Sequence, residues 1–257
     1  MTHIPFGFMR SRVLWTPDQI TTLGWWDASD TASITESGGA VSNVAEQKGG
    51  VDFIQNTGSL QPVTGIRSQN GLNVLDFDGT EQLQMIGNGA FAIAQPTNVS
   101  FISVHAVDVV NNNSDGLWST TSANNDYVFE SNINSEFRGN VSMSNNPDLQ
   151  LTPVQANDGP SIYGLRFSRA DSTTSAFIDG DPRGVVAMNN NLGPNHMIRL
   201  MVSRGTARVD GWWGEMVVLN DDTTTTRQLI EGYLAWKWGL QGNLPGGHPY
   251  KNFAPTV

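Results

Sequence analysis

The chain contains no cysteine, which excludes disulfide bonds and thiolate metal sites and is compatible with any redox compartment. Basic residues are also scarce: lysine and arginine number 14 against 24 aspartate and glutamate residues, giving a formal net charge of −10. Nucleic acids and anionic membranes favour clusters of basic residues, so we expect neither as a partner. No apolar run is long enough for a membrane span or a secretory signal. A neutral polymer or another protein remains as the expected partner.

Histidine is scarce as well, and metal-binding patterns are missing. The four histidines show no His-x-x-His or His-Glu-x-x-His spacing, which argues against a zinc centre. Asp27 and Asp30 with Ser29, or Asp76 with Asp78, carry oxygens of the kind that Ca²⁺ accepts. However, no EF-hand-type loop surrounds them, and this cation needs about six to eight ligands. We therefore expect no metal ion and no cofactor.

The residues that are abundant indicate a single all-β domain. Hydrophobic residues make up 38% of the 257 positions, enough for a substantial core, and eight tryptophans can anchor it. Charged residues are only 15%, and glycine, asparagine, serine and threonine are frequent, which is typical of many short strands joined by turns. No internal repeat and no linker divides the chain.

Alternating apolar residues predict the strands. Between 162 and 167, Tyr163, Leu165 and Phe167 alternate with their neighbours at the period of a strand that has one face in a core. An Asp179-Gly180 turn predicts a hairpin between the segments 176–178 and 185–188. Further strands are expected at 72–77, 99–110, 197–202 and 212–219, with 99–110 central in a sheet because it is apolar on both faces.

One amphipathic helix is predicted near the end of the chain, at about residues 224–238. Leu229, Tyr233 and Trp236 fall on one helical stripe, and a second stripe is formed by Ile230, Leu234 and Trp238. Asp221 and Asp222 offer N-cap oxygens, Gly239 is well placed to end the helix, and the following proline and glycine residues prevent its continuation. We expect Trp236 and Trp238 to be packing residues.

Two tryptophan pairs are expected to divide their rings between the two faces of strands. Neighbouring side chains of a strand point to opposite faces, so one ring of Trp25-Trp26 and one of Trp212-Trp213 should enter the core. The outward rings could be sugar platforms, but we favour packing beneath the C-terminal helix, which needs an apolar surface for its own stripe.

Several segments resemble the laminin G-like, concanavalin A-like jelly-roll domains of bacteriophage structural proteins and of multidomain proteins from aquatic bacteria. The landmarks of this resemblance cover about residues 14–257 and include Leu14-Trp-Thr-Pro, Trp25-Trp-Asp-Ala-Ser-Asp30, Ala32-Ser-Ile-Thr35, Gln61-Pro62, Gly71 to Gly79, Gly214 to Asn220 and Glu231 to Val257. The resemblance implies an all-β, two-sheet antiparallel sandwich with one C-terminal helix. It is specific for fold and weak for function, since this sandwich carries lectins, glycan hydrolases and inert structural modules.

The resemblance further implies a non-enzymatic structural protein on the surface of a phage particle, in capsid decoration (cement) or in a tail or fibre. Its location would be the virion, assembled in the host cytoplasm and released by lysis, with other virion proteins and further copies of itself as partners. Residues 1–13 precede the landmarks and form a predicted assembly arm, whose apolar residues need a partner. The candidate arm residues are Ile4, Phe6, Phe8, Arg10 and Arg12.

Two asparagine-rich segments, 111–116 and 188–195, are predicted to be exposed loops. Their amides and neighbouring aromatic rings form a candidate glycan-binding set: Asn112, Asn113, Asp115, Trp118, Tyr127, Asn190 and Asn191. The alternative is that they are ordinary polar loops, which are rich in these residues in any case. We expect weak polysaccharide adhesion at most.

The alternative function from another class is a glycan hydrolase. Asp76, Asp78 and Glu81 have the spacing of the Glu-x-Asp-x-x-Glu strand that retaining enzymes of this fold use, with carboxyl groups about 5 Å apart. The first acid is the shorter aspartate, however, and Asp78-Gly79 is better explained as a hairpin turn leading into the segment 82–86. We therefore expect no catalysis.

Overall fold

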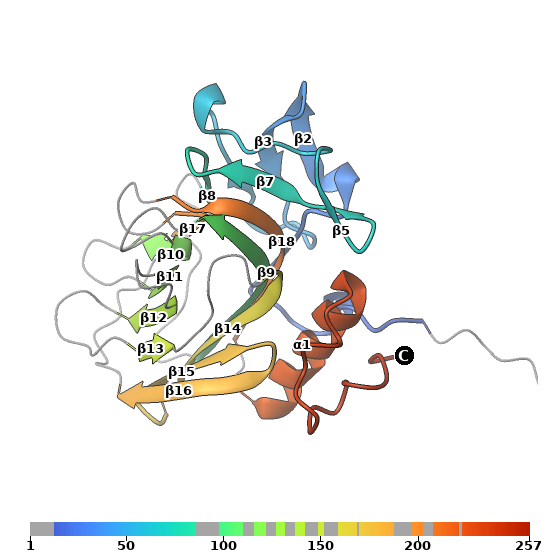
Figure 1. Cartoon of the computed structure of the whole chain (residues 1–257), viewed down its shortest axis with the longest axis vertical. Helices are drawn as coiled ribbons and strands as arrows, with labels where there is room; N and C mark the ends of the chain where they lie inside the picture. The colour runs from blue at the N-terminus through green and yellow to red at the C-terminus, as the bar shows by residue number, and fades with distance from the viewer. Residues whose placement is uncertain are drawn as a thin grey trace, which may run out of the picture.

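The computed structural model describes residues 13–85, 98–109, 116–121, 127–131, 137–141, 149–151, 159–168, 170–187, 197–202, 208–220 and 223–257. Two large antiparallel sheets and one C-terminal helix confirm the predicted fold class (Figure 1). A seven-stranded sheet has the order β1-β18-β9-β14-β15-β16, with β7 also paired to β18. A nine-stranded sheet has the order β13-β12-β11-β10-β17-β8-β4-β3-β2, and β5 pairs with β6.

The strands of the first half are β1 Gly24–Asp27, β2 Ile34–Ser37, β3 Ala40–Val44, β4 Phe53–Ile54, β5 Ser68–Gln69, β6 Leu72–Asn73, β7 Leu75–Asp78, β8 Leu83–Met85, β9 Val99–Val109 and β10 Gly116–Thr121. The later strands are β11 Tyr127–Ser131, β12 Phe137–Val141, β13 Leu149–Leu151, β14 Ser161–Ser168, β15 Thr173–Ile178, β16 Asp181–Ala187, β17 Met197–Leu200 and β18 Asp210–Leu219. The helices are η1 Pro17–Gln19, η2 Thr31–Ser33, η3 Gly58–Leu60 and α1 Thr224–Trp238.

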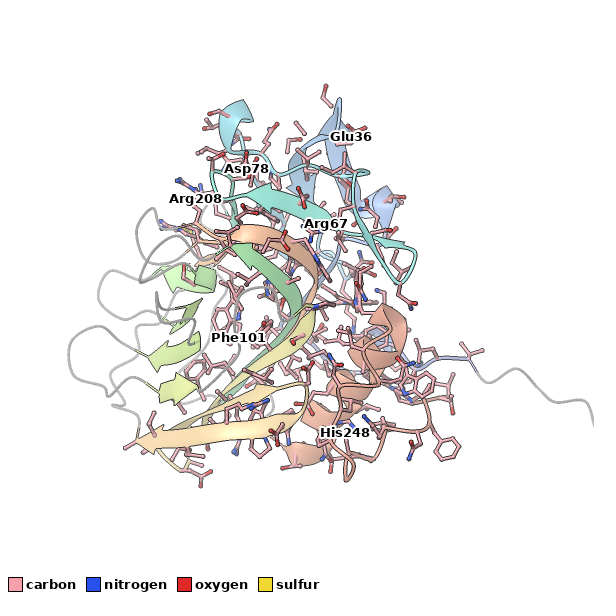
Figure 2. All side chains as sticks on the ribbon, in the orientation of Figure 1. Glu36, Arg67, Asp78, Phe101, Arg208 and His248 are labelled. Atoms are coloured by element: carbon pink, nitrogen blue, oxygen red, sulfur yellow. The ribbon has the colours of Figure 1, made fainter. Side chains whose placement is uncertain are left out.

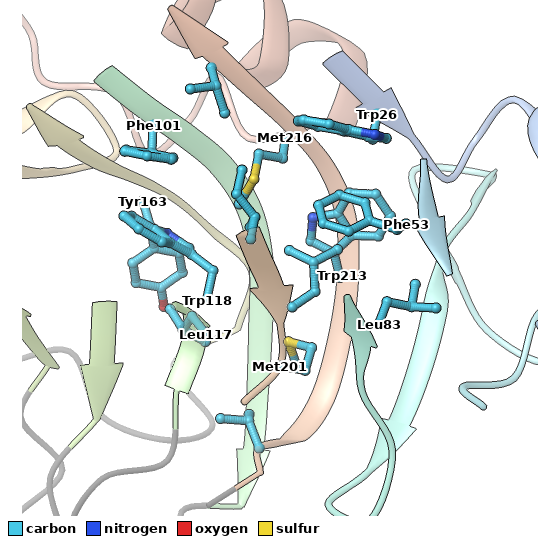
Figure 3. Packing of buried hydrophobic residues seen from close by; sticks show 14 of the residues in the cluster. Trp26, Phe53, Leu83, Phe101, Leu117, Trp118, Tyr163, Met201, Trp213 and Met216 are labelled. Atoms are coloured by element: carbon cyan, nitrogen blue, oxygen red, sulfur yellow. The ribbon is translucent and has the colours of Figure 1, made fainter. Parts of the chain in front are cut away.

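The elements form three layers, because the seven-stranded sheet is covered on both faces. One face packs against the nine-stranded sheet through a core that contains Trp26, Phe53, Phe101, Trp118 and Trp213 (Figure 3). The other face packs against α1 through a second apolar cluster. Strands β9 and β14 in the middle of the sheet are therefore buried on both sides. The prediction that 99–110 is central is confirmed.

The tryptophan pairs divide as predicted between the two apolar clusters. Trp26 and Trp213 are fully buried between the sheets, and Trp25 and Trp212 lie in the cluster beneath α1. In β14, Tyr163, Leu165 and Phe167 likewise face the inter-sheet core. The opposite face of β14, which carries Ile162, belongs to the cluster beneath α1.

The helix has the predicted span and the predicted end. Gly239 adopts a left-handed conformation at φ 74°, which glycine tolerates without a steric penalty, and caps the C-terminus. The N-cap is Thr223, whose hydroxyl accepts a 3.3 Å hydrogen bond from the Thr226 amide. The predicted N-caps Asp221 and Asp222 lie outside the described residues, and Thr223, immediately before the first helical residue, is the N-cap in their place.

The two aromatic stripes of the helix are not equally buried. Trp238 is fully buried, whereas Trp236 is only partly buried and donates its Nε1 hydrogen bond to the carbonyl of Tyr250, at 2.8 Å. The stripe that contains Trp238 faces the sheet, and Trp236 contacts the C-terminal tail instead. Both rings are packing residues, as predicted.

The predicted hairpin at Asp78-Gly79 is wrong. Strand β7 pairs with β18 in the seven-stranded sheet, whereas β8 pairs with β4 and β17 in the nine-stranded sheet. The segment between them therefore crosses from one sheet to the other. The Asp179-Gly180 hairpin between β15 and β16 is confirmed, with positive φ at both turn residues.

The start of the described chain pairs with its end. Leu14 forms an antiparallel bridge with Thr256, the Trp15 amide donates to the Pro255 carbonyl at 2.9 Å, and the Val257 amide donates to the Val13 carbonyl at 3.2 Å. The predicted arm residues Ile4, Phe6, Phe8, Arg10 and Arg12 lie outside the described residues. Within the part that the structure describes, no helix has the length and apolar character of a membrane span.

Candidate functional site

Glu215 is the centre of a buried polar network between the seven-stranded sheet and α1. Its side chain is fully buried, and its Oε1 accepts hydrogen bonds from Trp25 Nε1 at 2.7 Å and from the Tyr233 hydroxyl at 2.8 Å. Its Oε2 accepts from Lys237 Nζ at 2.7 Å and from Trp238 Nε1 at 2.8 Å. Burial raises the pKa of Glu215, since desolvation disfavours its charged form.

A backbone irregularity in β18 directs Glu215 toward the helix. The pairing of β18 with β9 shifts between Trp213 and Glu215, leaving Gly214 as an extra residue. A Cβ atom at Gly214 would lie 3.0 Å from the Trp238 ring, so glycine permits this close approach. Strict alternation would place residue 215 on the face of Trp213, in the inter-sheet core; the bulge returns it to the helix side.

Asp27 completes the network at the end of β1. Its Oδ2 lies 2.5 Å from Lys237 Nζ, and its Oδ1 accepts from both the amide and the hydroxyl of Ser29, at 2.9 and 2.6 Å. The ammonium of Lys237 occupies the position that a cation ligated by Asp27 would need, and Asp30 is the N-cap of η2. Among the described residues, no three histidine, aspartate or glutamate side chains are grouped as metal ligands.

A second buried group fixes the C-terminal tail to the helix. Glu231 accepts from Arg227 at 2.5 Å and contacts Nε2 of the buried His248 at 3.2 Å. The Tyr250 amide donates to Nδ1 of His248 at 3.2 Å, which leaves Nε2 to donate to Glu231. Tyr250 also packs directly on Gly232, where a Cβ atom would approach its ring to 2.6 Å. Within the C-terminal landmark, Glu231, Gly232, His248 and Tyr250 are thus internal anchors.

The acids of the hydrolase hypothesis lie on and after β7, where Asp78 and Arg67 are seen far from His248, which is near α1 (Figure 2). Arg67 donates to Asp76 at 3.0 Å and makes two hydrogen bonds to Asp108, at 2.5 and 2.9 Å. The hydrogen bond to Asp108 is the main reason why the pKa of Arg67 is raised, although burial opposes the rise. Asp76 therefore shares one guanidinium group with Asp108.

Asp78 and Glu81 form a separate pair that shares a hydrogen bond. Burial, together with this bond, raises the pKa of Glu81 to about 7, and the same bond lowers the pKa of Asp78. The Asp78 amide also donates to Glu81 at 2.6 Å, and the Asp78 carboxylate accepts from Thr80. Carboxyl groups in direct contact lie closer than the about 5 Å of retaining enzymes or the about 6.5–9.5 Å of inverting ones.

The three acids do not share one set of partners. Leu75 and Phe77 of β7 face the inter-sheet core, so Asp76 points to the outer face, where Arg67 holds it. Glu81 lies beyond β7 on the crossover to the other sheet and is only 8% exposed. Asp210, the cross-strand partner of Asp78, has a pKa raised by burial and by the neighbouring carboxylates. This geometry does not support the hydrolase alternative.

Of the candidate glycan-binding residues, only Trp118 has a side chain within the described part of the structure. Trp118 is fully buried in the inter-sheet core, with its ring stacked at 4.4 Å on Phe101 (Figure 3), so it cannot be a sugar platform. The prediction that Trp118 stacks on a sugar is wrong, because strand β10 places its ring in the inter-sheet core. Tyr127 begins β11, but its side chain lies outside the described part. The remaining candidates also lie outside the described residues: Asn112, Asn113, Asp115, Asn190 and Asn191.

The sequence did not predict which residues pair with the acids Asp76 and Glu215. Arg67 lies in a segment with no recognisable motif, and Asp108 is near the end of a long apolar strand. Glu215 and Lys237 stand inside landmarks, but local periodicity gives no sign that they meet. The one available signal was that charged residues interrupt apolar stretches at Asp27, Glu215 and Lys237, which indicates buried pairing.

No protein-family model matches the chain. No curated protein matches its sequence either. Among solved structures, Trypanosoma rangeli sialidase in complex with sialic acid is similar with a TM-score of 0.57 and 11% sequence identity, over 83% of this chain and 33% of that chain. The CBM40 of Ruminococcus gnavus IT-sialidase, bound to α2,6-sialyllactose, has a TM-score of 0.43 and 10% identity, over 51% of this chain and 80% of that chain. The chain spans about a third of the length of the sialidase, and at this identity the likeness shows a shared β-sandwich fold alone.

Proposed function

We propose that the protein is a non-enzymatic structural module on the surface of a phage particle, in capsid decoration or in a tail or fibre. The observation that carries the proposal is the network around Glu215. Residues from three landmarks, among them Trp25, Asp27, Glu215, Tyr233 and Lys237, bind one another inside the domain. Their role is to hold the helix on the sandwich, so the landmark pattern is explained by folding and requires no catalytic site.

The acids at the edge of the sandwich support the same conclusion. Asp76 is paired with Arg67, and Asp78 shares a hydrogen bond with Glu81, so these three acids are engaged with other side chains of the domain. The net charge of −10 also favours contact with proteins or neutral glycans over nucleic acid. Glycan adhesion is a secondary role, consistent with a β-sandwich, and would depend on the asparagine-rich segments.

The assembly arm gives the first test. Deleting residues 1–12 should leave a folded domain that no longer joins the particle, because Val13 and all later pairing partners of the tail are kept. A matched variant of full length, with Phe6 and Phe8 replaced by serine, should fail in the same way if apolar contacts drive assembly. Melting curves check the fold, and immunogold labelling of purified particles checks incorporation. Normal incorporation of the shortened protein would refute the arm.

Incubation with polysaccharides tests the absence of catalysis. We expect no new reducing ends from laminarin, agar, alginate or host-surface polysaccharide, and at most weak retardation in affinity electrophoresis, because contacts made mainly by loop amides desolvate little area. Glu81→Gln is the diagnostic variant, since it removes the only carboxyl group of the Asp78 pair that is protonated near neutral pH. Turnover that disappears in a folded Glu81→Gln protein would replace the structural proposal by the hydrolase alternative.

A further inference from the structure

Lys237, Asp27 and Glu215 bring an amine into direct contact with two carboxyl groups. The Nζ atom of Lys237 lies 2.5 Å from Asp27 Oδ2 and 2.7 Å from Glu215 Oε2. The exposed fraction of the side chain is 13% for Lys237, 9% for Asp27 and 0% for Glu215. Such groups are shielded from solvent and held in one geometry, which favours a reaction between them over exchange with water.

The surroundings of the three residues are aromatic and apolar. The rings of Trp25, Tyr233 and Trp238 all donate hydrogen bonds to Glu215, and the same rings belong to the apolar cluster beneath α1. This environment fixes the Glu215 carboxylate beside the amine of Lys237. Burial raises the pKa of Glu215, although the hydrogen bonds from Lys237 and Trp25 oppose the rise, and the raised pKa makes this carboxylate a stronger proton acceptor than an exposed glutamate.

The two oxygens of Asp27 have different partners. Oδ2 contacts the amine, while Oδ1 accepts from the amide of Ser29 at 2.9 Å and from its hydroxyl at 2.6 Å. Two donors on one oxygen are the arrangement that stabilises negative charge when a nucleophile adds to a carbonyl carbon. Asp27 is thus polarised as an electrophile, with Oδ2 facing the amine as the leaving oxygen.

We propose that Lys237 and Asp27 join in an intramolecular amide bond, an isopeptide cross-link that forms within the folded chain, with Glu215 as the proton relay. The chain has no cysteine, so this link would supply a covalent connection that a disulfide cannot. It would tie the first strand of the sandwich to the C-terminal helix across 210 positions of sequence.

The reaction balances without any further reagent. The Lys237 ammonium passes one proton to Asp27 Oδ2, and the freed amine attacks Cγ to form the new C–N bond, while negative charge develops on Oδ1 beside Ser29. Glu215 takes a second proton from the nitrogen and transfers it to Oδ2. The Cγ–Oδ2 bond breaks, one water molecule leaves, and the amide keeps one hydrogen. Glu215 ends in the protonation state in which it began.

The mass of the purified full-length protein tests the cross-link directly. We expect an intact mass lower than the sequence mass by one water molecule, and a protease digest in which one branched peptide contains both Asp27 and Lys237. An intact mass equal to the sequence mass after prolonged incubation of the folded protein overturns the proposal. A water lost elsewhere, such as by succinimide formation at an Asp-Gly site, would leave the two peptides separate and would also overturn it.

Three variants complete the experiment. Lys237→Arg keeps the charge but lacks the amine nucleophile, so its mass should equal its sequence mass, whereas the matched control Lys48→Arg should still lose one water. Glu215→Gln keeps the shape of the side chain and should be unlinked or linked at least tenfold more slowly. In a denaturing gel the wild type, held as a closed loop, should migrate faster than Lys237→Arg. Equal linkage rates in wild type and Glu215→Gln would overturn the relay role of Glu215.

Discussion

Replacing Trp238 with alanine is expected to lower the free energy of unfolding by about 3–5 kcal/mol. The ring is fully buried beneath the sheet, lies 6.4 Å from the Trp212 ring and packs over Gly214. Its Nε1 also donates to Glu215, so the variant combines a cavity with the loss of one donor to a buried carboxylate. Such a loss is a large part of the about 5–15 kcal/mol that stabilises a typical domain.

Denaturant unfolding measures this effect, and the same helix provides a matched control. Trp236 is only partly buried and contacts the tail, so Trp236→Ala should cost clearly less than Trp238→Ala. Equal losses would show that the helix is anchored through the tail as strongly as through the sheet. If Trp238→Ala left the free energy of unfolding unchanged within experimental error, the packing of this ring would not stabilise the fold.

Acidification is expected to destabilise the fold through His105. The side chain is fully buried in β9 beside the Tyr163 ring, and neither ring nitrogen has a hydrogen-bond partner. Burial lowers the pKa of His105 from 6.5 to about 3. Below pH about 6.5 the unfolded chain therefore binds a proton that the folded protein does not bind. Stability is lost as the pH falls from about 6.5 to about 3, by about 1.4 kcal/mol per pH unit and on the order of 4 kcal/mol in total.

Unfolding curves between pH 7.5 and 3 for the wild type and for His105→Gln test this expectation, and the difference between them isolates the histidine. Glu81 and Asp179 act in the opposite direction, because burial raises their pKa values to about 7 and about 6, so the folded protein binds their protons first. Their contributions are common to both proteins and cancel. Parallel pH profiles would show that His105 is not held in its neutral form.

The helix and many of the strands could be predicted from local patterns. The stripe of Ile230, Leu234 and Trp238 indicates a helix, and Gly239 ends it. Both signals could be found in the sequence because they depend on residues only a few positions apart. The same is true of the turn at Asp179-Gly180 and of the division of Trp25 and Trp26 between two faces. The resemblance of the landmarks added the two-sheet arrangement. The arm, the virion location and the domain boundary stay predictions.

The candidate site could not be predicted in the same way. The spacing of Asp76, Asp78 and Glu81 fits a catalytic strand, but that strand ends at Asp78, and Glu81 lies on the crossover to the other sheet, where β8 begins at Leu83. The same spacing gave no sign that Arg67 would pair with Asp76. Trp118 likewise follows a polar segment in sequence, yet its strand places the ring in the core.

The amino-acid sequence by itself determined the class of fold, the extent of the helix and the absence of disulfides, since composition and short-range periodicity control these features. Tertiary structure alone decided that Asp27, Glu215 and Lys237 meet. They come from β1, β18 and α1, and only the extra residue Gly214 in β18 turns Glu215 toward the helix. A one-residue bulge reverses the face of every later side chain in a strand, and the contacts that result join positions up to 210 residues apart.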